Sequence, residues 1–269
     1  MNKERLVIFA DYGLDDACAT VFLLQNRNFD CIDVVPIGGN VSCEIALRNA
    51  KTLLAAAKED GLCVEGVRII DSTARPQAFC ALPLIHGSDG LGDILTPAES
   101  PVPVLPFDEW LSTLGAYTML SLGPATVPVQ VLEYAPHLCA GEIVIMGGCT
   151  HEAPNYGNYE FNHGLDTEAF AKLLHYPHVC ATLDTCRAPA FNAGHTHKEG
   201  NSLFARLVNR SVVLANARHA GNCYIYDLIA AYALVYPNRF TVRSEHIGKD
   251  AVRELVTTET TCALLKESK

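Results

Sequence analysis

Near the amino terminus the chain reads Leu6-Val7-Ile8-Phe9-Ala10-Asp11-Tyr12-Gly13-Leu14-Asp15-Asp16. The first five residues form a short, continuous apolar run, which is typical of a strand buried on both faces of a parallel sheet. Three carboxylates follow within six residues. In open α/β sheets, ligands bind beyond the carboxyl ends of the strands. The stretch therefore predicts a first strand over residues 6–10 that ends directly in a ligand-binding loop.

Similar apolar runs recur along the chain and alternate with helical patterns. We expect further strands over residues 32–37, 64–70, 116–122, 142–146 and 179–184. We expect helices over residues 16–25, 42–60, 127–138, 166–175, 201–217 and 225–235. Strands and helices that alternate in this way predict an α/β fold with a doubly wound, mostly parallel sheet flanked by helices. No linker divides the chain, so residues 1–269 are interpreted as one domain, and the proline-rich segment 96–106 as a long surface loop.

Composition narrows the functional class. The 269 residues are 49% hydrophobic and carry a formal net charge of −10, which disfavours nucleic acid and anionic membranes as partners. No stretch approaches the roughly 20 apolar residues of a membrane span. The 11 cysteines include no Cys-x-x-Cys pair, which favours a reducing compartment, and we expect a cytoplasmic protein.

The acidic loop indicates a metal site. Asp11, Asp15 and Asp16 repel one another unless a positive charge offsets them, and Gly13 lets the backbone turn so that they can converge. Hard oxygen ligands without histidine or cysteine favour Ca²⁺ or Mg²⁺. The alternative is that Asp15 and Asp16 only complement the positive end of the following helix.

These residues resemble the amino-terminal hallmark of the inosine–uridine-preferring nucleoside hydrolases, Asp-x-Asp-Pro-Gly-x-Asp-Asp. Further matches to that family occur in the expected order along most of the chain. They are Gly38-Gly39-Asn40-Val41, His86-Gly87-Ser88-Asp89-Gly90-Leu91-Gly92, Leu122-Gly123-Pro124, Met146-Gly147-Gly148, Glu160-Phe161-Asn162 and Tyr226-Asp227.

The resemblance implies Ca²⁺-dependent hydrolysis of an N-ribosidic bond of a nucleoside, a small-molecule substrate, to free base and ribose. Members of the family commonly form dimers or tetramers, so a homo-oligomer is expected. The implied calcium ligands are Asp11, Asp16, Asp227 and the main-chain carbonyl of Leu122. Asp11 would also act as general base on a water that the cation orients and acidifies.

The resemblance also implies a set of substrate contacts. Asp15 matches the residue at the ribose 2′-hydroxyl, and Asp227 would contact the 3′-hydroxyl as well as the metal. The remaining sugar contacts would come from Asn40, Glu160 and Asn162. An asparagine of the family maps to either Asn155 or Asn158, and Asn158 is preferred because Gly157 precedes it.

Several positions depart from the family pattern. Phe9 replaces the leading Asp, Tyr12 replaces the Pro, and Tyr226 replaces a His that protonates the leaving base in many members. Tyr226 and His86 are nevertheless the candidate groups on the leaving-base side, although His86 could equally bond to loop backbone.

Two alternative functions stay open, the first because of these departures and the second because of the acidic loop. One is a non-catalytic ribose or nucleoside-binding protein that keeps the metal and sugar ligands. The other is a phosphatase of the haloacid dehalogenase type, which also begins with an Asp after the first strand. It is ranked lower because Gly13 stands where that family has its second Asp.

Overall fold

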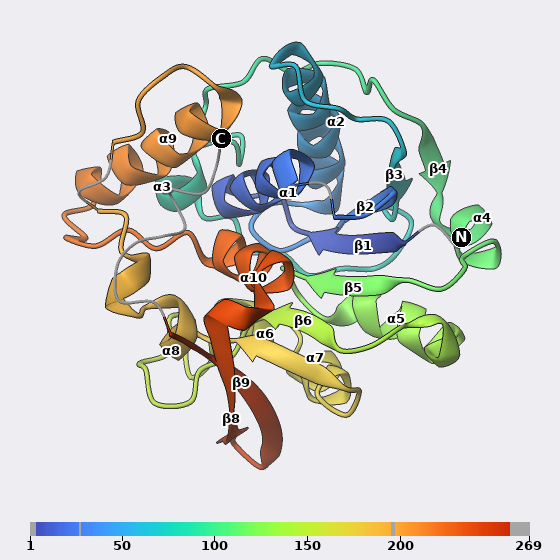
Figure 1. The fold of residues 1–269 in the computed structure, drawn as a ribbon, viewed down its shortest axis with the longest axis vertical. Helices are drawn as coiled ribbons and strands as arrows, with labels where there is room; N and C mark the ends of the chain where they lie inside the picture. The colour runs from blue at the N-terminus through green and yellow to red at the C-terminus, as the bar shows by residue number, and fades with distance from the viewer. Residues whose placement is uncertain (1–3, 27, 195–196, 259–269) are drawn as a thin grey trace.

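The strands form one sheet in the computed structural model, which describes residues 4–26, 28–194 and 197–258. The order of the nine strands is β4-β3-β2-β1-β5-β6-β7-β9-β8 (Figure 1). All neighbours are parallel except the antiparallel pair β8 and β9, so the predicted doubly wound, mostly parallel sheet is confirmed. The strands are β1 (Arg5–Ala10), β2 (Cys31–Pro36), β3 (Val67–Asp71), β4 (Val104–Pro106), β5 (Thr118–Ser121), β6 (Ile143–Met146), β7 (His178–Ala181), β8 (Phe240–Ile247) and β9 (Asp250–Thr257).

Helices cover both faces of the sheet, and each face has its own apolar core. On β1, Leu6 and Ile8 belong to one core, whereas Val7 and Phe9 belong to the other. This alternation explains why the whole strand is apolar. The first core is closed by α1 (Leu14–Asn26), α2 (Cys43–Glu59), α9 (Leu203–Ala217) and α10 (Tyr226–Val235). The second is closed by α4 (Phe107–Ser112), α5 (Thr126–Tyr134) and α7 (Thr167–Leu173).

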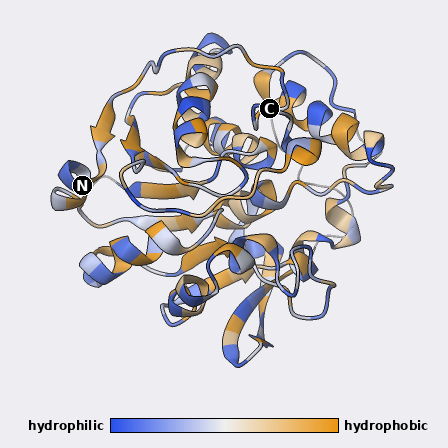
Figure 2. Cartoon of the chain, turned by 180° about the vertical axis from the view of Figure 1, so that it is seen from behind, coloured by the Kyte–Doolittle hydropathy of each residue, from blue (hydrophilic) through white to orange (hydrophobic). Residues whose placement is uncertain are grey.

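Hydrophobic residues concentrate on the strands and on the sides of the helices that face them (Figure 2). Short helices complete the connections, namely α3 (Pro83–His86), α6 (Phe161–Leu165), α8 (Leu183–Cys186), η1 (Pro136–Leu138), η2 (Pro189–Phe191) and η3 (Pro237–Arg239). None of the described helices is both long and apolar enough to traverse a lipid bilayer.

Three strands lie where no strand was predicted. β4 falls inside the segment predicted to be a loop, and its three residues at the sheet edge include a proline, which edge strands tolerate. The hairpin of β8 and β9 has mostly exposed residues in β8, so it lacks the continuous apolar run by which the other strands were recognised. The prediction for residues 179–184 was too long, because Thr182 ends the strand by capping α8.

The strand order creates a switch point between β1 and β5. Strands β2, β3 and β4 follow one another on one side of β1, with β4 at the edge of the sheet. β5, the next strand in the sequence, lies on the other side of β1. The connections therefore diverge, with α1 on one face and α5 on the other. Such a divergence opens a crevice at the carboxyl ends of the two strands. The crevice lies between Asp11, after β1, and Leu122, after β5.

The opposite end of the same strands contains a buried ion cluster. Asp33 of β2 is inaccessible to solvent. Its carboxylate accepts hydrogen bonds from Arg5 Nη1 at 3.0 Å, from Arg68 Nε and Nη2 at 2.7 Å each, and from Trp110 Nε1 at 2.8 Å. Every carboxylate oxygen therefore has a charged or polar partner.

Candidate active site

Three aspartates converge at the switch point. Asp11 follows β1, Asp16 lies in the first turn of α1, and Asp227 lies in the first turn of α10. One carboxylate oxygen from each lies within 4.8 Å of the others, and all three residues are buried. The packing of α10 on α1 brings Asp227 to this place from more than 200 residues away in the sequence.

No Lys or Arg within the described part of the chain forms an ion pair with these carboxylates. Burial raises the pKa of Asp11 to about 7, and the nearby charge of Asp15 adds to this effect. Burial and the neighbouring aspartates also raise the pKa values of Asp16 and Asp227. A set of buried oxygen donors with excess negative charge fits a hard divalent cation such as Ca²⁺.

Backbone and side-chain contacts fix the orientation of Asp11. Its Oδ2 accepts from the Asn40 backbone N–H and its Oδ1 from Asn40 Nδ2, both at 2.8 Å. A Cβ at Gly39 would collide with this carboxylate, so the residue before Asn40 must be glycine. Asp16 in turn accepts from the backbone N–H groups of Asp11 at 3.1 Å and Gly13 at 2.8 Å.

Asp15 and His86 form a second part of the site. His86 Nδ1 accepts a hydrogen bond from the Leu14 backbone N–H at 3.1 Å, so its lone pair is occupied. The Oδ1 atom of Asp15 lies 3.6 Å from the same nitrogen and has no hydrogen-bond partner. Burial lowers the pKa of His86, which favours the neutral ring with its proton on Nε2. His86 therefore bonds to loop backbone, as one of the two alternatives predicted, and it also lines the cavity.

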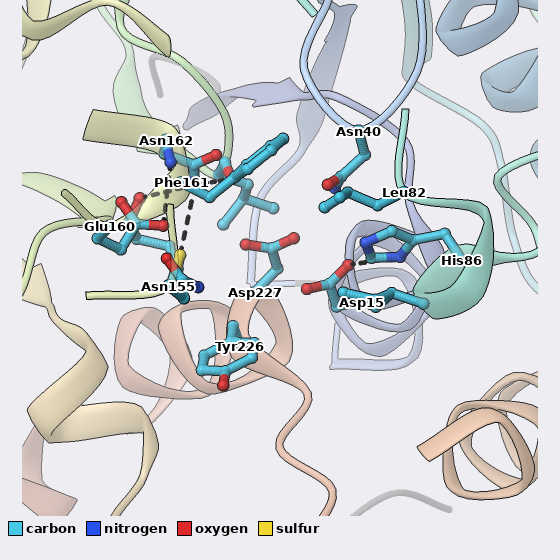
Figure 3. A pocket seen from close by; sticks show the side chains of 13 residues that line it. Asp15, Asn40, Leu82, His86, Asn155, Glu160, Phe161, Asn162, Tyr226 and Asp227 are labelled. Carbon is cyan, nitrogen blue, oxygen red and sulfur yellow. Dashed lines mark hydrogen bonds and ion pairs between the residues drawn. The ribbon is translucent and has the colours of Figure 1, made fainter. Parts of the chain in front are cut away.

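The opposite wall is formed by the loops after β5 and β6 (Figure 3). The Leu122 carbonyl accepts a hydrogen bond from Asn162 Nδ2 at 2.8 Å. Glu160 is the N-cap of α6 and accepts from the backbone N–H groups of Gly148, Asn162 and His163 at 2.9–3.0 Å. Burial raises the pKa of Glu160. Asn162 and Glu160 thus hold the wall in place while lining the cavity.

Two predicted residues lie differently from expectation. Asn158 is exposed and does not line the cavity, whereas Asn155 does. Of the two asparagines to which the family residue could map, the structure therefore places Asn155, and not the preferred Asn158, at the cavity. Tyr226 lines the cavity, but its hydroxyl points away from Asp227 (Figure 3). The hydroxyl accepts a hydrogen bond from Arg187 Nε at 3.5 Å, and burial raises the pKa of Tyr226.

These residues enclose an inner cavity of about 70 Å³. Its walls also contain residues that sequence analysis did not predict, namely Leu82, Ile85, Met146 and Phe161. Phe161 and Met146 lie within motifs that were recognised, so a signal for them existed. Leu82 and Ile85 come from α3 and the residue before it, where no local pattern marks a binding role.

The same order of motifs is found in a known family. A sequence profile of the inosine-uridine preferring nucleoside hydrolases matches residues 6–266. The chain belongs to this family. Two changes first noted as departures from its pattern have local structural explanations. Phe9 packs into the second core, and Tyr12 adopts a φ of 44°, which proline cannot reach.

Nucleoside hydrolases are also the relatives found by direct comparison. A probable uridine nucleosidase 2 from Arabidopsis thaliana is 27% identical over 72% of this chain, and a non-specific ribonucleoside hydrolase from Klebsiella pneumoniae is 29% identical over 63%. The chain spans less than two thirds of these relatives, 59% and 57% of their lengths. A non-specific ribonucleoside hydrolase from Salmonella paratyphi A is 28% identical, with 89% of this chain and 82% of that one covered.

Solved structures show the same nucleoside hydrolase fold. A purine-preferring ribonucleoside hydrolase from Gardnerella vaginalis superposes with a TM-score of 0.75 and 20% identity, covering 98% of this chain and 96% of that one. A plant nucleoside hydrolase gives a TM-score of 0.75 and 21% identity, with 98% of each chain covered. At these identities the likeness is one of fold.

Proposed function

We propose that this protein hydrolyses the N-glycosidic bond of a ribonucleoside or related N-riboside, in a calcium-dependent reaction that yields free base and ribose. The observation that carries the proposal is the convergence of Asp11, Asp16 and Asp227 beside the unbonded carboxylate oxygen of Asp15. Membership of the nucleoside hydrolase family supports the same reaction.

Calcium would be held by Asp11, Asp16, Asp227 and the carbonyl of Leu122, where it would orient the sugar and acidify a water. Asp11 would act as general base on that water. The two hydrogen bonds from Asn40 hold the Asp11 carboxylate in one orientation for this transfer. Because the ribosyl group gains positive charge as the base leaves, the surrounding carboxylates stabilise the transition state.

The ribose hydroxyls supply the hydrogen-bond donors that this cavity lacks. Asp15 Oδ1 is buried without a partner, and the occupied lone pair of His86 Nδ1 prevents a bond between the two. The 2′-hydroxyl would donate to Asp15 and the 3′-hydroxyl to Asp227. Asn40, Asn155, Glu160 and Asn162 complete the walls around the sugar. A deoxyribose would leave Asp15 unpaired and bind poorly.

On the leaving-base side, His86 is the better-placed hydrogen-bond donor. Its neutral ring carries a proton on Nε2, which can stabilise charge on the departing base. Tyr226 remains a candidate acid, but its hydroxyl is directed away from Asp227 and lies beside Arg187. We therefore propose that Tyr226 mainly contacts the base ring.

A steady-state assay tests the proposal. Inosine, uridine and nicotinamide riboside are incubated with the protein in calcium or in excess chelator, and released ribose is measured as reducing sugar. We expect release in calcium and its loss in chelator. Both purine and pyrimidine substrates are needed, because the relatives include a uridine nucleosidase and a purine-preferring hydrolase. Absence of ribose release from all three would contradict the proposal.

The second candidate is a non-catalytic nucleoside-binding protein, favoured by the engagement of Tyr226 with Arg187. It predicts calcium-dependent binding of ribose or inosine by calorimetry without product formation. Turnover that is lost in Asp11→Asn would exclude it.

Two further properties remain proposals. Cys18, Cys43, Cys180, Cys186 and Cys223 are buried thiols outside any disulfide, which supports a reducing compartment such as the cytoplasm. A dimer or tetramer follows from the family resemblance, and light scattering after size-exclusion chromatography would measure it.

A further inference from the structure

A second cavity of about 240 Å³ adjoins the inner one. The two share the lining residues Asp15, Ile85, His86, Asn155 and Tyr226, so they lie side by side. We call the second space the outer cavity; it is bordered by the end of α9, the end of α8 and the loop before α10.

Two arginines line the outer cavity. Arg218, at the end of α9, donates to the Leu84 carbonyl at 2.6 Å through Nη1. No carboxylate in residues 4–26, 28–194 or 197–258 lies within ion-pair distance of it. Arg187 contacts Glu152 at 3.0 Å and the Ala153 carbonyl at 3.1 Å, both through Nη1. Arg218 is thus anchored through Nη1, and Arg187 through Nη1 and through Nε, which donates to the Tyr226 hydroxyl. Within the described residues the Nη2 group of each arginine donates no hydrogen bond and is available to a ligand.

The outer cavity therefore differs from the inner one in charge. The inner cavity collects carboxylates, whereas the outer cavity has two guanidinium groups opposed by Asp15 at the boundary and by Glu152 beside Arg187. The charge of Arg218 also reaches His86, whose pKa it lowers. An uncharged base would leave Arg218 without a counter-ion.

The geometry places the leaving base, and not the 5′ end of the sugar, in the outer cavity. The 2′-hydroxyl is next to the anomeric carbon, and in the proposed function it lies at Asp15. Asp15 and His86 border the outer cavity, whereas Glu160 and Asn162, on the opposite wall, do not. A base leaving from the anomeric carbon thus enters the space between His86, Arg187 and Arg218.

We propose that the substrate is a riboside whose leaving base carries a carboxylate, and that Arg187 and Arg218 bind this carboxylate in the outer cavity. The inference rests on the proposed function. A pyridinium carboxylate is the chemical class that fits best, because its positive ring would lie near Asp15 and its carboxylate near the arginines.

This class also removes the need for a strong leaving-group acid. When the bond between the anomeric carbon and the ring nitrogen breaks, its electron pair returns to the positively charged nitrogen and gives a neutral ring. Water forms the new C–O bond at the anomeric carbon, and its proton passes to Asp11 and then to solvent. No proton has to be delivered to the base, which agrees with the orientation of Tyr226 away from Asp227.

The test compares nicotinic acid riboside with nicotinamide riboside, which differ only in a carboxylate and an amide. We expect kcat/KM to be higher for the acid by about tenfold or more, as for a charged hydrogen-bonded contact. Arg218→Gln should bring the ratio close to one, and Arg218→Lys should retain part of the preference. Arg253→Gln is the matched control, because it removes one positive charge from a residue that lines neither cavity. An equal or higher kcat/KM for the amide in the unsubstituted protein would overturn the inference.

A binding experiment separates this inference from the proposed function. Calorimetry on the Asp11→Asn variant measures the affinity of both ribosides without turnover. Tighter binding of the acid, lost in Asp11→Asn/Arg218→Gln, supports the inference even if no riboside is hydrolysed. Equal binding of the two overturns it. A preference for uridine 5′-monophosphate over uridine that depends on Arg218 would place the anion on the sugar and would also overturn it.

Discussion

The two ends of strands β1 and β2 both bury carboxylates, but they neutralise them in different ways. Toward the amino ends, Asp33 is surrounded by Arg5, Arg68 and the indole N–H of Trp110. At the carboxyl ends, Asp11 has Asp16 and Asp227 as neighbours and no basic side chain of the described chain as an ion-pair partner.

The difference separates a structural site from a functional one. The charge of a buried carboxylate beside two arginines is balanced by the protein itself. Removing the carboxylate or the arginines leaves an uncompensated charge. Three buried carboxylates repel one another when no positive side chain pairs with them. Burial and this repulsion raise their pKa values, as is typical of functional sites. The carboxylates are buried to the same extent at both ends of the strands. The two sites therefore differ in the groups that surround the carboxylates, and not in their burial.

The strongest test of the comparison is Asp11→Asn. We expect kcat to fall by about 10³-fold, because an amide cannot accept the proton of the attacking water. Asp108→Asn, at an exposed side chain of α4, is the control and should retain activity. Activity of Asp11→Asn within about tenfold of the unsubstituted protein would show that another group is the base.

The corresponding change at the other end is Asp33→Asn. We expect the free energy of unfolding, measured in urea, to fall by about 3–5 kcal/mol, because Arg5 and Arg68 lose a buried counter-ion. The kcat of the folded fraction should not change. If Asp33→Asn were no more destabilising than Asp108→Asn, the ion cluster would not have the structural role assigned to it.

Calcium should stabilise the fold through Asp11, Asp16 and Asp227, and not through the Asp33 cluster, which already contains two arginines. In chelator, Asp11 has an ordinary pKa of 3.8 when unfolded and a pKa of about 7 when folded. The folded state therefore binds more protons between these values, and its stability falls as pH rises through this window. Saturating calcium should add about 2–3 kcal/mol at pH 8, where the carboxylates are ionised, and much less at pH 5. Thermal melts at both pH values measure this, and an equal gain at each would contradict it.

The smallest effect is expected for Tyr226→Phe. Because the hydroxyl is bound by Arg187 and directed away from Asp227, kcat should fall by less than about tenfold. The measurement is the pH profile of kcat with inosine, and Tyr134→Phe, at an exposed position of α5 outside both cavities, is the control. A loss of more than about 100-fold with an unchanged KM would identify Tyr226 as the leaving-group acid.

Sequence patterns predicted most of the parallel sheet because its central strands are apolar on both faces. They did not predict the β8–β9 hairpin, whose exposed positions have no periodic apolar signal. Within the site, Asp11, Asp15 and Asp16 form one local motif and were found directly. Sequence patterns could not distinguish Asn155 from Asn158, because the choice between them depends on the path of the loop. They missed Arg218, because a single basic residue at a helix end has no distinctive pattern.

The sequence by itself determined the strand that ends in an acidic loop, since hydrophobic burial and local charge repulsion depend on neighbouring residues. The family resemblance had named Asp227, but its proximity to Asp11 and Asp16 is seen only in the folded chain. The folded chain also shows that His86 Nδ1 bonds to the Leu14 backbone instead of Asp15, and that two arginines line the outer cavity. These relations come from the packing of α10 on α1 and of α9 against α3, and such long-range contacts leave no local trace in the order of residues.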